Sequence, residues 1–157
     1  MNINLKTLIG KLNDSCRQAA ERAASLCMGS GNYEVDLEHL FLALLEQPQC
    51  DFSLIARRSG IPAGTLEKDL AAEIAKFRNG NTRTPVFSPH LPSLFEHAWL
   101  LASLDSGTTR IRSGHLLLAL LTQPDLSQLA YRGSKQFARI KREELKHNFS
   151  ALTEGSQ

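Results

Sequence analysis

Two histidines at equivalent places in a repeated segment are the side chains best placed for chemistry. His39 opens the run His39-Leu-Phe-Leu-Ala-Leu-Leu-Glu-Gln-Pro48, and His115 opens His115-Leu-Leu-Leu-Ala-Leu-Leu-Thr-Gln-Pro124, with eight of ten positions identical. A twinned pair of imidazoles could bridge a metal ion, but no Cys, Asp or Glu recurs at ligand spacing on these segments. We therefore predict no metal site and expect each ring to be hydrogen-bonded and packed in the seam between the repeats.

The other reactive residue types form no catalytic pattern. Cys16, Cys27 and Cys50 are an odd number without a CxxC pair, which indicates buried thiols rather than disulfides or a zinc cluster. The sequence contains neither a GxxxxGK[ST] phosphate loop nor a GxSxG elbow. We predict no catalytic residue and no bound cofactor in this segment, and recognition of another protein as the leading class of function.

Composition and charge limit the classes of partner that we expect this chain to bind. The 157 residues carry a formal net charge of +2 with both signs mixed, which argues against a dedicated nucleic-acid surface. A basic bias between residues 132 and 146 is typical of a solvated helix face, and a nucleic-acid module stays a minor alternative. The chain start lacks a signal-peptide core and no apolar run could span a bilayer, so we expect a cytoplasmic protein without membrane contact.

Helical periodicity dominates the first half. Apolar residues spaced by three and four predict one long amphipathic helix from Leu5 to about Met28. Asp36 is expected to cap a short buried helix over residues 37–45. Residues 52–56 then predict a third helix, and Pro62 starts a fourth that continues to Asn79-Gly80.

The second half repeats this order after a Pro-rich loop. Helices are expected over residues 94–104, from a Ser113 cap through the second His-Leu-Leu-Leu-Ala-Leu-Leu run, over 126–132, and from a Ser134 cap to Leu152. We predict an all-α, pseudo-twofold fold of two tandem four-helix repeats in one domain, with repeats at about 5–78 and 93–150 and a joining loop at about 79–92. The tail at 153–157 is expected to be frayed or to begin a linker.

The motifs resemble a known family. The twin HLxLALL helices and the run GIPxGxLxxDL at residues 60–70 are similar to the Clp N-terminal repeat domain of AAA+ unfoldases, across essentially the whole chain. Within the family, the stretches at residues 85–91, 98–104 and 110–116 resemble the ClpV branch of bacterial type VI secretion. The resemblance implies an eight-helix fold with an N-terminally extended first helix.

The resemblance also implies a function. ClpV-like N-domains recognise an amphipathic helix near the N-terminus of the type VI sheath protein (VipB, also called TssC), so that contracted sheaths are disassembled in the bacterial cytoplasm. ATP and magnesium would be needed only by AAA+ modules absent from this sequence, which would form a hexamer while the isolated domain stays a monomer. The alternative within the family is the N-domain of a disaggregase or protease-linked Clp unfoldase that binds adaptors or unfolded polypeptide. A helical hydrolase or metal enzyme is a further, minor alternative.

An apolar strip at the start of the chain is the candidate peptide groove. Ile3, Leu5 and Leu8 extend the stripe of the first helix beyond the expected core, and an unpaired strip at a domain edge suits helix-in-groove recognition. Leu12 and Cys16 can instead belong to the core, and Phe87 can plug the seam between the repeats. Arg17, together with Asn13, could orient a bound helix. The predicted groove residues are Leu5, Leu8, Ile9, Leu12, Asn13, Cys16 and Phe87.

Overall fold

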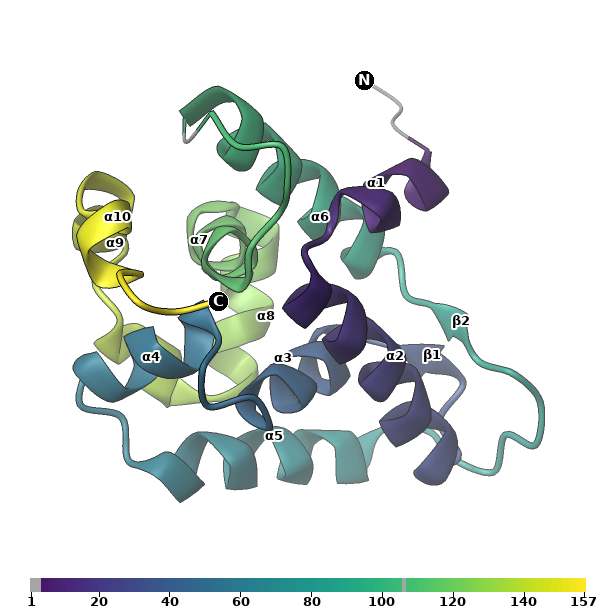
Figure 1. Ribbon diagram of the computed structural model, residues 1–157. Helices are drawn as coiled ribbons and strands as arrows, with labels where there is room; N and C mark the ends of the chain where they lie inside the picture. The colour runs from purple at the N-terminus through teal and green to yellow at the C-terminus, as the bar shows by residue number, and fades with distance from the viewer. Residues whose placement is uncertain (1–3, 106) are drawn as a thin grey trace.

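The protein is mostly helical, which agrees with the predicted all-α class, in a computed structural model that describes residues 4–105 and 107–157 (Figure 1). The elements of these residues are α1 (Leu5–Lys11), α2 (Asp14–Gly29), β1 (Glu34–Val35), α3 (Leu37–Leu45), α4 (Asp51–Arg58), α5 (Ala63–Lys76), β2 (Val86–Phe87), α6 (His90–Leu100), the π-helical turn η1 (Leu101–Asp105), α7 (Ser113–Thr122), α8 (Pro124–Gly133), the 3-10 turn η2 (Lys135–Arg139), α9 (Arg142–His147) and α10 (Phe149–Leu152).

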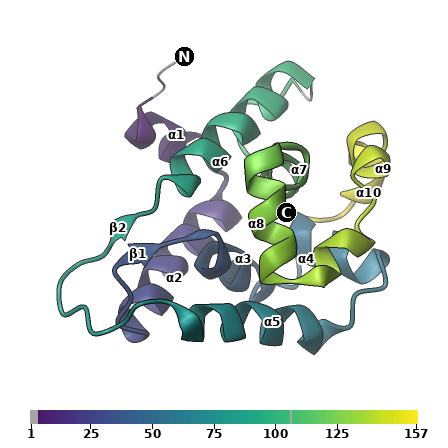
Figure 2. The same cartoon turned by 180° about the vertical axis from the view of Figure 1, so that it is seen from behind.

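The two repeated apolar helices, α3 and α7, form the centre of the molecule. α3 packs against α2 and α5, and α7 packs against α6, α8 and α4. Every residue of α7 from Ser113 to Leu121 is buried, as expected for a helix with no polar face. Figure 2 shows α8 running from α7 towards α5, so that the second half closes against the first.

Short parallel pairings tie the two halves together crosswise. β1, which precedes α3, pairs with β2, which precedes α6 of the other half. The residue equivalent to Val35 at the repeat offset is Ile111, which precedes α7 and forms a parallel bridge with Leu12 just before α2. The start of each central helix, α3 or α7, is therefore held by a segment that precedes a helix of the other half.

This pairing divides the predicted first helix in two. Leu12 and Asn13 have extended backbone angles, and Asn13 donates its backbone N–H to the Ile111 carbonyl at 2.9 Å. The Asn13 side chain accepts a hydrogen bond from the Cys16 N–H at 2.9 Å and so caps α2. The continuous helix predicted from Leu5 to Met28 is wrong because strand-like pairing outweighs a helical pattern that runs through residue 12.

The predicted last helix is also divided, and the tail is not frayed. Ser134 caps the 3-10 turn η2 rather than a long helix, and Ile140 and Asn148 interrupt the rest. Thr153 is buried. The Gln157 N–H donates to the Gln49 carbonyl at 2.9 Å, and the Gln157 carbonyl accepts from the Asp51 N–H at 3.1 Å. The tail is therefore held against the start of α4.

Candidate functional site

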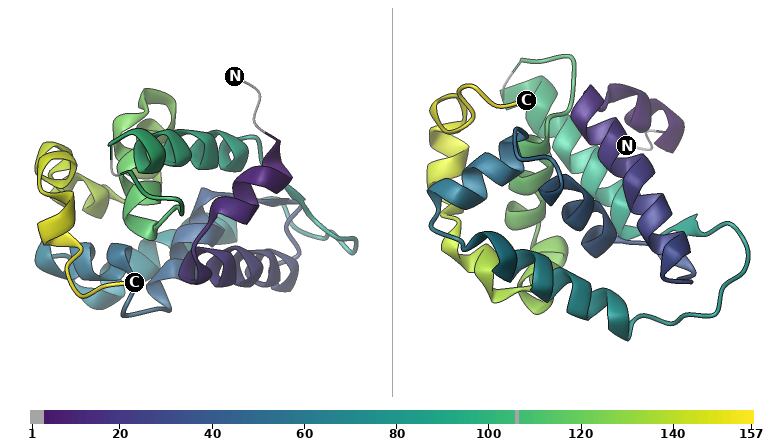
Figure 3. Two further views of the ribbon diagram at one scale, coloured as in Figure 1. Left: turned by 45° about the horizontal axis from the view of Figure 1, so that its top comes forward. Right: turned by 60° about the horizontal axis from the view of Figure 1, so that its bottom comes forward.

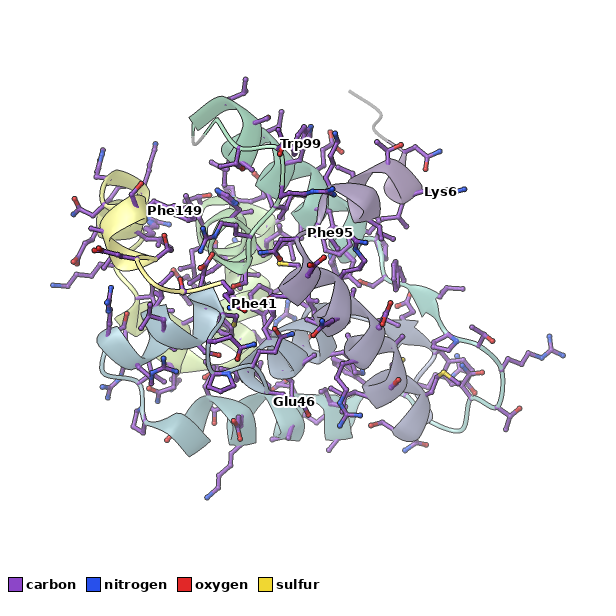
Figure 4. All side chains as sticks on the ribbon, in the orientation of Figure 1. Lys6, Phe41, Glu46, Phe95, Trp99 and Phe149 are labelled. Atoms are coloured by element: carbon purple, nitrogen blue, oxygen red, sulfur yellow. The ribbon has the colours of Figure 1, made fainter. Side chains whose placement is uncertain are left out.

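α1 carries three of the seven predicted groove residues and lies along α6 (right view of Figure 3). Its end is fixed by backbone and side-chain bonds: the Ile111 N–H donates to the Lys11 carbonyl at 2.7 Å, and Arg110 Nη1 donates to the Gly10 carbonyl at 2.6 Å. Lys11 Nζ lies 4.9 Å from the centre of the Trp99 ring, a cation–π contact with α6. Figure 4 shows Phe95 and Trp99 on α6 beside α1, with Lys6 pointing away from them. α1 is thus a short helix docked on α6.

The predicted groove residues divide by burial. Leu8, Leu12 and Cys16 are 1 %, 0 % and 0 % exposed, so they belong to the core beneath α1 and α2. Leu5 and Ile9 are half-buried at the edge of the core. Ile3 lies outside the described residues. Among the described apolar side chains of α1, only Leu5 and Ile9 are therefore accessible to a partner.

Phe87 lies on β2, and α6 packs against both β2 and α1. Its ring is half-buried against the core, and the neighbouring Val86 is 63 % exposed. The loop that contains it is not a plain linker, because Ser88 donates its backbone N–H to Val35 at 2.9 Å and its hydroxyl to Asp36 at 2.9 Å. Phe87 thus holds a fixed position at a partly exposed edge.

The polar residues predicted to orient a ligand have structural partners. The Asn13 side chain is used as the α2 cap, so it is not a side chain on an exposed helix face. Arg17 is exposed and its Nη2 donates to the Leu12 carbonyl at 3.2 Å. A guanidinium keeps further N–H groups free to point outward, so Arg17 can still meet a partner.

The twin histidines act as helix-start residues, as predicted for a structural role. His39 Nδ1 accepts the Asp36 N–H at 2.9 Å and its Nε2 lies 2.9 Å from Asn32 Oδ1. His115 Nδ1 accepts the Arg112 N–H at 3.0 Å, the equivalent bond in the second half. Burial lowers the pKa of His39 below its ordinary value and that of His115 to about 4, so both rings are neutral near pH 7.

One polar cluster was missed from the sequence. The Asp51 carboxylate, fully buried, accepts bonds from Arg112 Nε at 2.9 Å, from Arg112 Nη2 at 2.7 Å and from the Gly114 N–H at 3.1 Å. The Ser156 hydroxyl also donates to Asp51. The hydrogen bond to Asp51 raises the pKa of Arg112 above its already high value.

A comparison of equivalent positions in the two repeats gives a sequence signal for this cluster. Arg112 occupies the place where Asp36 caps α3 in the first half, so the cap carboxylate of α7 had to come from elsewhere in the fold. Asp51, at the start of α4 in the other half, supplies it. Also, Ser113, predicted as the cap, is instead the first residue of α7, and its hydroxyl accepts the Phe52 N–H at 3.0 Å.

The described residues give no sign of metal chemistry or of a membrane segment. No group of three or more His, Cys, Asp or Glu side chains among residues 4–105 and 107–157 could hold a metal ion. Over the same residues, no helix combines the length and the apolar character needed to cross a bilayer. The arrangement offers apolar edges and hydrogen-bonding groups, which are the means of binding a protein.

Comparisons with known proteins agree on the family. Residues 11–131 match the model of the Clp repeat (R) N-terminal domain. The chain is 35 % identical over 156 residues to chaperone protein ClpB of Yersinia enterocolitica and 34 % identical over 147 residues to AAA+ ATPase ClpV1 of Pseudomonas aeruginosa. These matches cover 99 % and 94 % of the chain but only 18 % and 16 % of the two relatives.

One similar solved structure is that of a domain with a bound peptide. The structure described as a complex of a ClpV N-domain with a VipB peptide is 36 % identical to this chain, with a TM-score of 0.86. The superposition covers 99 % of this chain and 95 % of that one. The match therefore includes α1 and the tail as well as the two repeats.

Proposed function

Because this chain belongs to the Clp repeat N-terminal domain family, we propose that it recognises substrate for a ClpV-like AAA+ ATPase. Its partner in this proposal is an amphipathic helix near the N-terminus of a type VI secretion sheath protein of the VipB or TssC type. Binding would deliver contracted sheaths for disassembly and reuse in the bacterial cytoplasm. The observation that carries the proposal is the likeness, over 99 % of the chain, to a ClpV N-domain in complex with a VipB peptide.

The proposal assigns the contact to the outer face of α1. Leu5 and Ile9 present half-buried apolar side chains there, and Phe87 lies across α6 on β2. An amphipathic helix could lay its apolar face on such an edge, with Arg17 as a polar contact at one end. Leu8, Leu12 and Cys16 would support this surface from below, because they are buried.

In this proposal the segment itself catalyses no reaction and needs no cofactor. ATP and magnesium would act in AAA+ modules of the kind named in the ClpV1 relative, and a hexamer would form through those modules, whereas the isolated domain would be a monomer. No nucleic acid or membrane takes part.

Substitution of Ile9 tests the assignment. A fluorescent peptide with the sequence of a VipB-type sheath N-terminus is titrated into the chain and into the Ile9→Asp variant. We expect affinity to fall at least about tenfold, as for an apolar anchor in an interface. Leu129→Asp, a half-buried leucine on α8, is the matched control and should bind as the unmodified chain does. Unchanged affinity in a folded Ile9→Asp variant would remove α1 from the site.

The second candidate is the N-domain of a disaggregase, favoured by the 35 % identity to ClpB. Such a domain would bind unfolded polypeptide or adaptor proteins. A pull-down that offers purified sheath and an unfolded model substrate separates the two functions. Retention of sheath alone supports the ClpV-like function, and retention of the unfolded substrate alone supports the ClpB-like one.

A further inference from the structure

α4 and α9 lie on the side of the molecule away from α1 (Figure 1). A basic hollow lies between α4 and the segment that joins η2 to α9. Its volume is about 240 Å³. Three exposed cations, Arg58, Arg139 and Lys141, stand around it, with Glu144 as its one acidic side chain. Ile55, Ile140, Leu145 and Leu152 supply the apolar lining, and Ser59 completes it.

Two of the cations are held in place by carbonyl oxygens. Arg58 Nη1 donates to the carbonyls of Ala151 and Leu152, both at 3.1 Å, at the end of α10. Arg139 Nη1 donates to the Gly60 carbonyl at 3.4 Å. A guanidinium has five N–H donors, so each arginine keeps donors for another acceptor while its position is already restricted. Less side-chain entropy is then lost when an anion binds.

The positive charge of the hollow is not neutralised within the described chain. Over residues 4–105 and 107–157, none of Arg58, Arg139 and Lys141 forms an ion pair. Arginines elsewhere in the fold do pair, as Arg22 does with Glu46 at 2.8 Å and Arg112 with Asp51 at 2.7 Å. The hollow therefore presents three cations against one carboxylate, a field that attracts an acidic partner.

The lining favours a polypeptide over a nucleic acid. Aliphatic side chains form the apolar part, which suits one aliphatic side chain of a partner. No aromatic ring is among the side chains that line the hollow, so it offers no platform on which bases could stack.

We propose that this basic hollow is a docking site for an acidic protein segment that carries an aliphatic residue between carboxylates. The aliphatic side chain would enter between Ile140 and Leu152, and the flanking carboxylates would meet Arg58 and Arg139. This site is separate from the α1 surface and does not depend on the sheath-binding proposal.

A short charged peptide tests the site directly. Fluorescein-labelled Glu-Glu-Leu-Glu-Glu is titrated at low salt into the whole chain and into the Arg58→Gln/Arg139→Gln/Lys141→Gln variant, with anisotropy as the readout. We expect saturable binding that weakens as NaCl is added, and a loss of at least about tenfold in the triple variant. A Lys68→Gln/Lys76→Gln/Arg83→Gln variant changes the formal charge equally on other surfaces and should stay within about twofold of the unmodified chain.

Three results would overturn the proposal. The first is equal affinity of the triple variant, and the second is equal affinity of a Gln-Gln-Leu-Gln-Gln peptide. The third is a short oligothymidylate that binds more tightly than the acidic peptide and loses that binding in the triple variant. If the triple variant loses its helical circular dichroism, Lys141→Glu replaces it, because the Lys141 side chain makes no hydrogen bond in the described residues. A loss of at least about threefold is then expected, and no loss overturns the site.

Discussion

At the scale of single residues, Gly114 shows how tightly α7 packs against α10 and the Asp51 cluster. A Cβ atom at this position would lie 2.8 Å from two ring carbons of Phe149 and 3.1 Å from Asp51 Oδ2. The Phe149 ring is itself stacked on His115, with the ring centres 4.6 Å apart. A methyl group therefore has no space without displacing α10 or the Asp51 cluster.

We expect Gly114→Ala to lower the free energy of unfolding by about 1–3 kcal/mol, the range for overpacking a filled site. Urea denaturation followed by circular dichroism measures the change. Gly64→Ala in α5 is the control, because no atom beyond its chain neighbours and the adjacent backbone of α5 lies within 4 Å of its added Cβ. The control should be neutral or slightly stabilising. A Gly114→Ala variant as stable as the control would show that Phe149 can move at little cost.

Glu38, in the first turn of α3, makes the stability depend on pH. Burial raises its pKa to about 7, with Asp36 and Glu73 nearby adding to the rise and Arg132 opposing it. The folded state then keeps a proton that the unfolded state releases near pH 4.5, so stability falls as pH rises between these values.

The Glu38→Gln variant should not lose stability in this way as the pH rises. We expect the difference in unfolding free energy, variant minus unmodified chain, to grow by more than about 1 kcal/mol from pH 5 to pH 8. Denaturation at several pH values measures it, and contributions from the histidines cancel in the difference. A difference that does not change with pH would mean that water reaches the carboxylate in the folded state.

At the scale of secondary structure, the break between α1 and α2 depends on Asn13. Its side chain caps α2 while its backbone N–H bonds to Ile111. We expect Asn13→Ala to lower the free energy of unfolding by about 1 kcal/mol, the usual cost of an N-cap lost. Asn148→Ala is the matched control, since Asn148 precedes α10 without a side-chain cap bond. Equal effects in thermal denaturation would show that the strand-like pairing alone positions α2.

The regular elements could be predicted because local signals and burial agree there. α3 was predicted over its observed range because Asp36 caps an apolar run that the Gln47-Pro48 pair ends. The break at Leu12 could not be predicted from periodicity, since Leu12 remains apolar and buried whether the backbone is helical or extended. The pairing that decides its conformation comes from Ile111, far along the chain.

The candidate site was predictable only in outline. The apolar stripe of the first helix indicated the region, but burial separates Leu5 and Ile9 from Leu8, Leu12 and Cys16, and burial depends on how α1 lies on α6. The Asp51 cluster joins residues from α4, the start of α7 and the tail. Residue spacing within one segment cannot reveal this cluster. The sequence feature that points to it is the presence of Arg112 in the second repeat at the position that Asp36 holds in the first.

At the scale of the whole molecule, the crosswise pairing means that neither repeat can complete its own core. The rings of Phe41 and Phe52 from the first half pack with Phe137 from the second, with centres 5.1–6.1 Å apart. Ser134 donates to Asp69 at 2.6 Å across the same seam, and the Asp51–Arg112 pair crosses it again. A separated half would expose these rings and leave a buried charge without its partner.

We therefore expect the chain to unfold in one cooperative transition, with Trp99 fluorescence and helical circular dichroism changing together in urea. Fragments 1–83 and 84–157, divided in the loop before β2, should each show weak helical signal without a cooperative melt, because each lacks the strand partner and the rings of the other. Mixing them should restore helical signal at equimolar ratio. A fragment that melts cooperatively by itself would contradict this view and would mean that the duplicated unit is an independent domain.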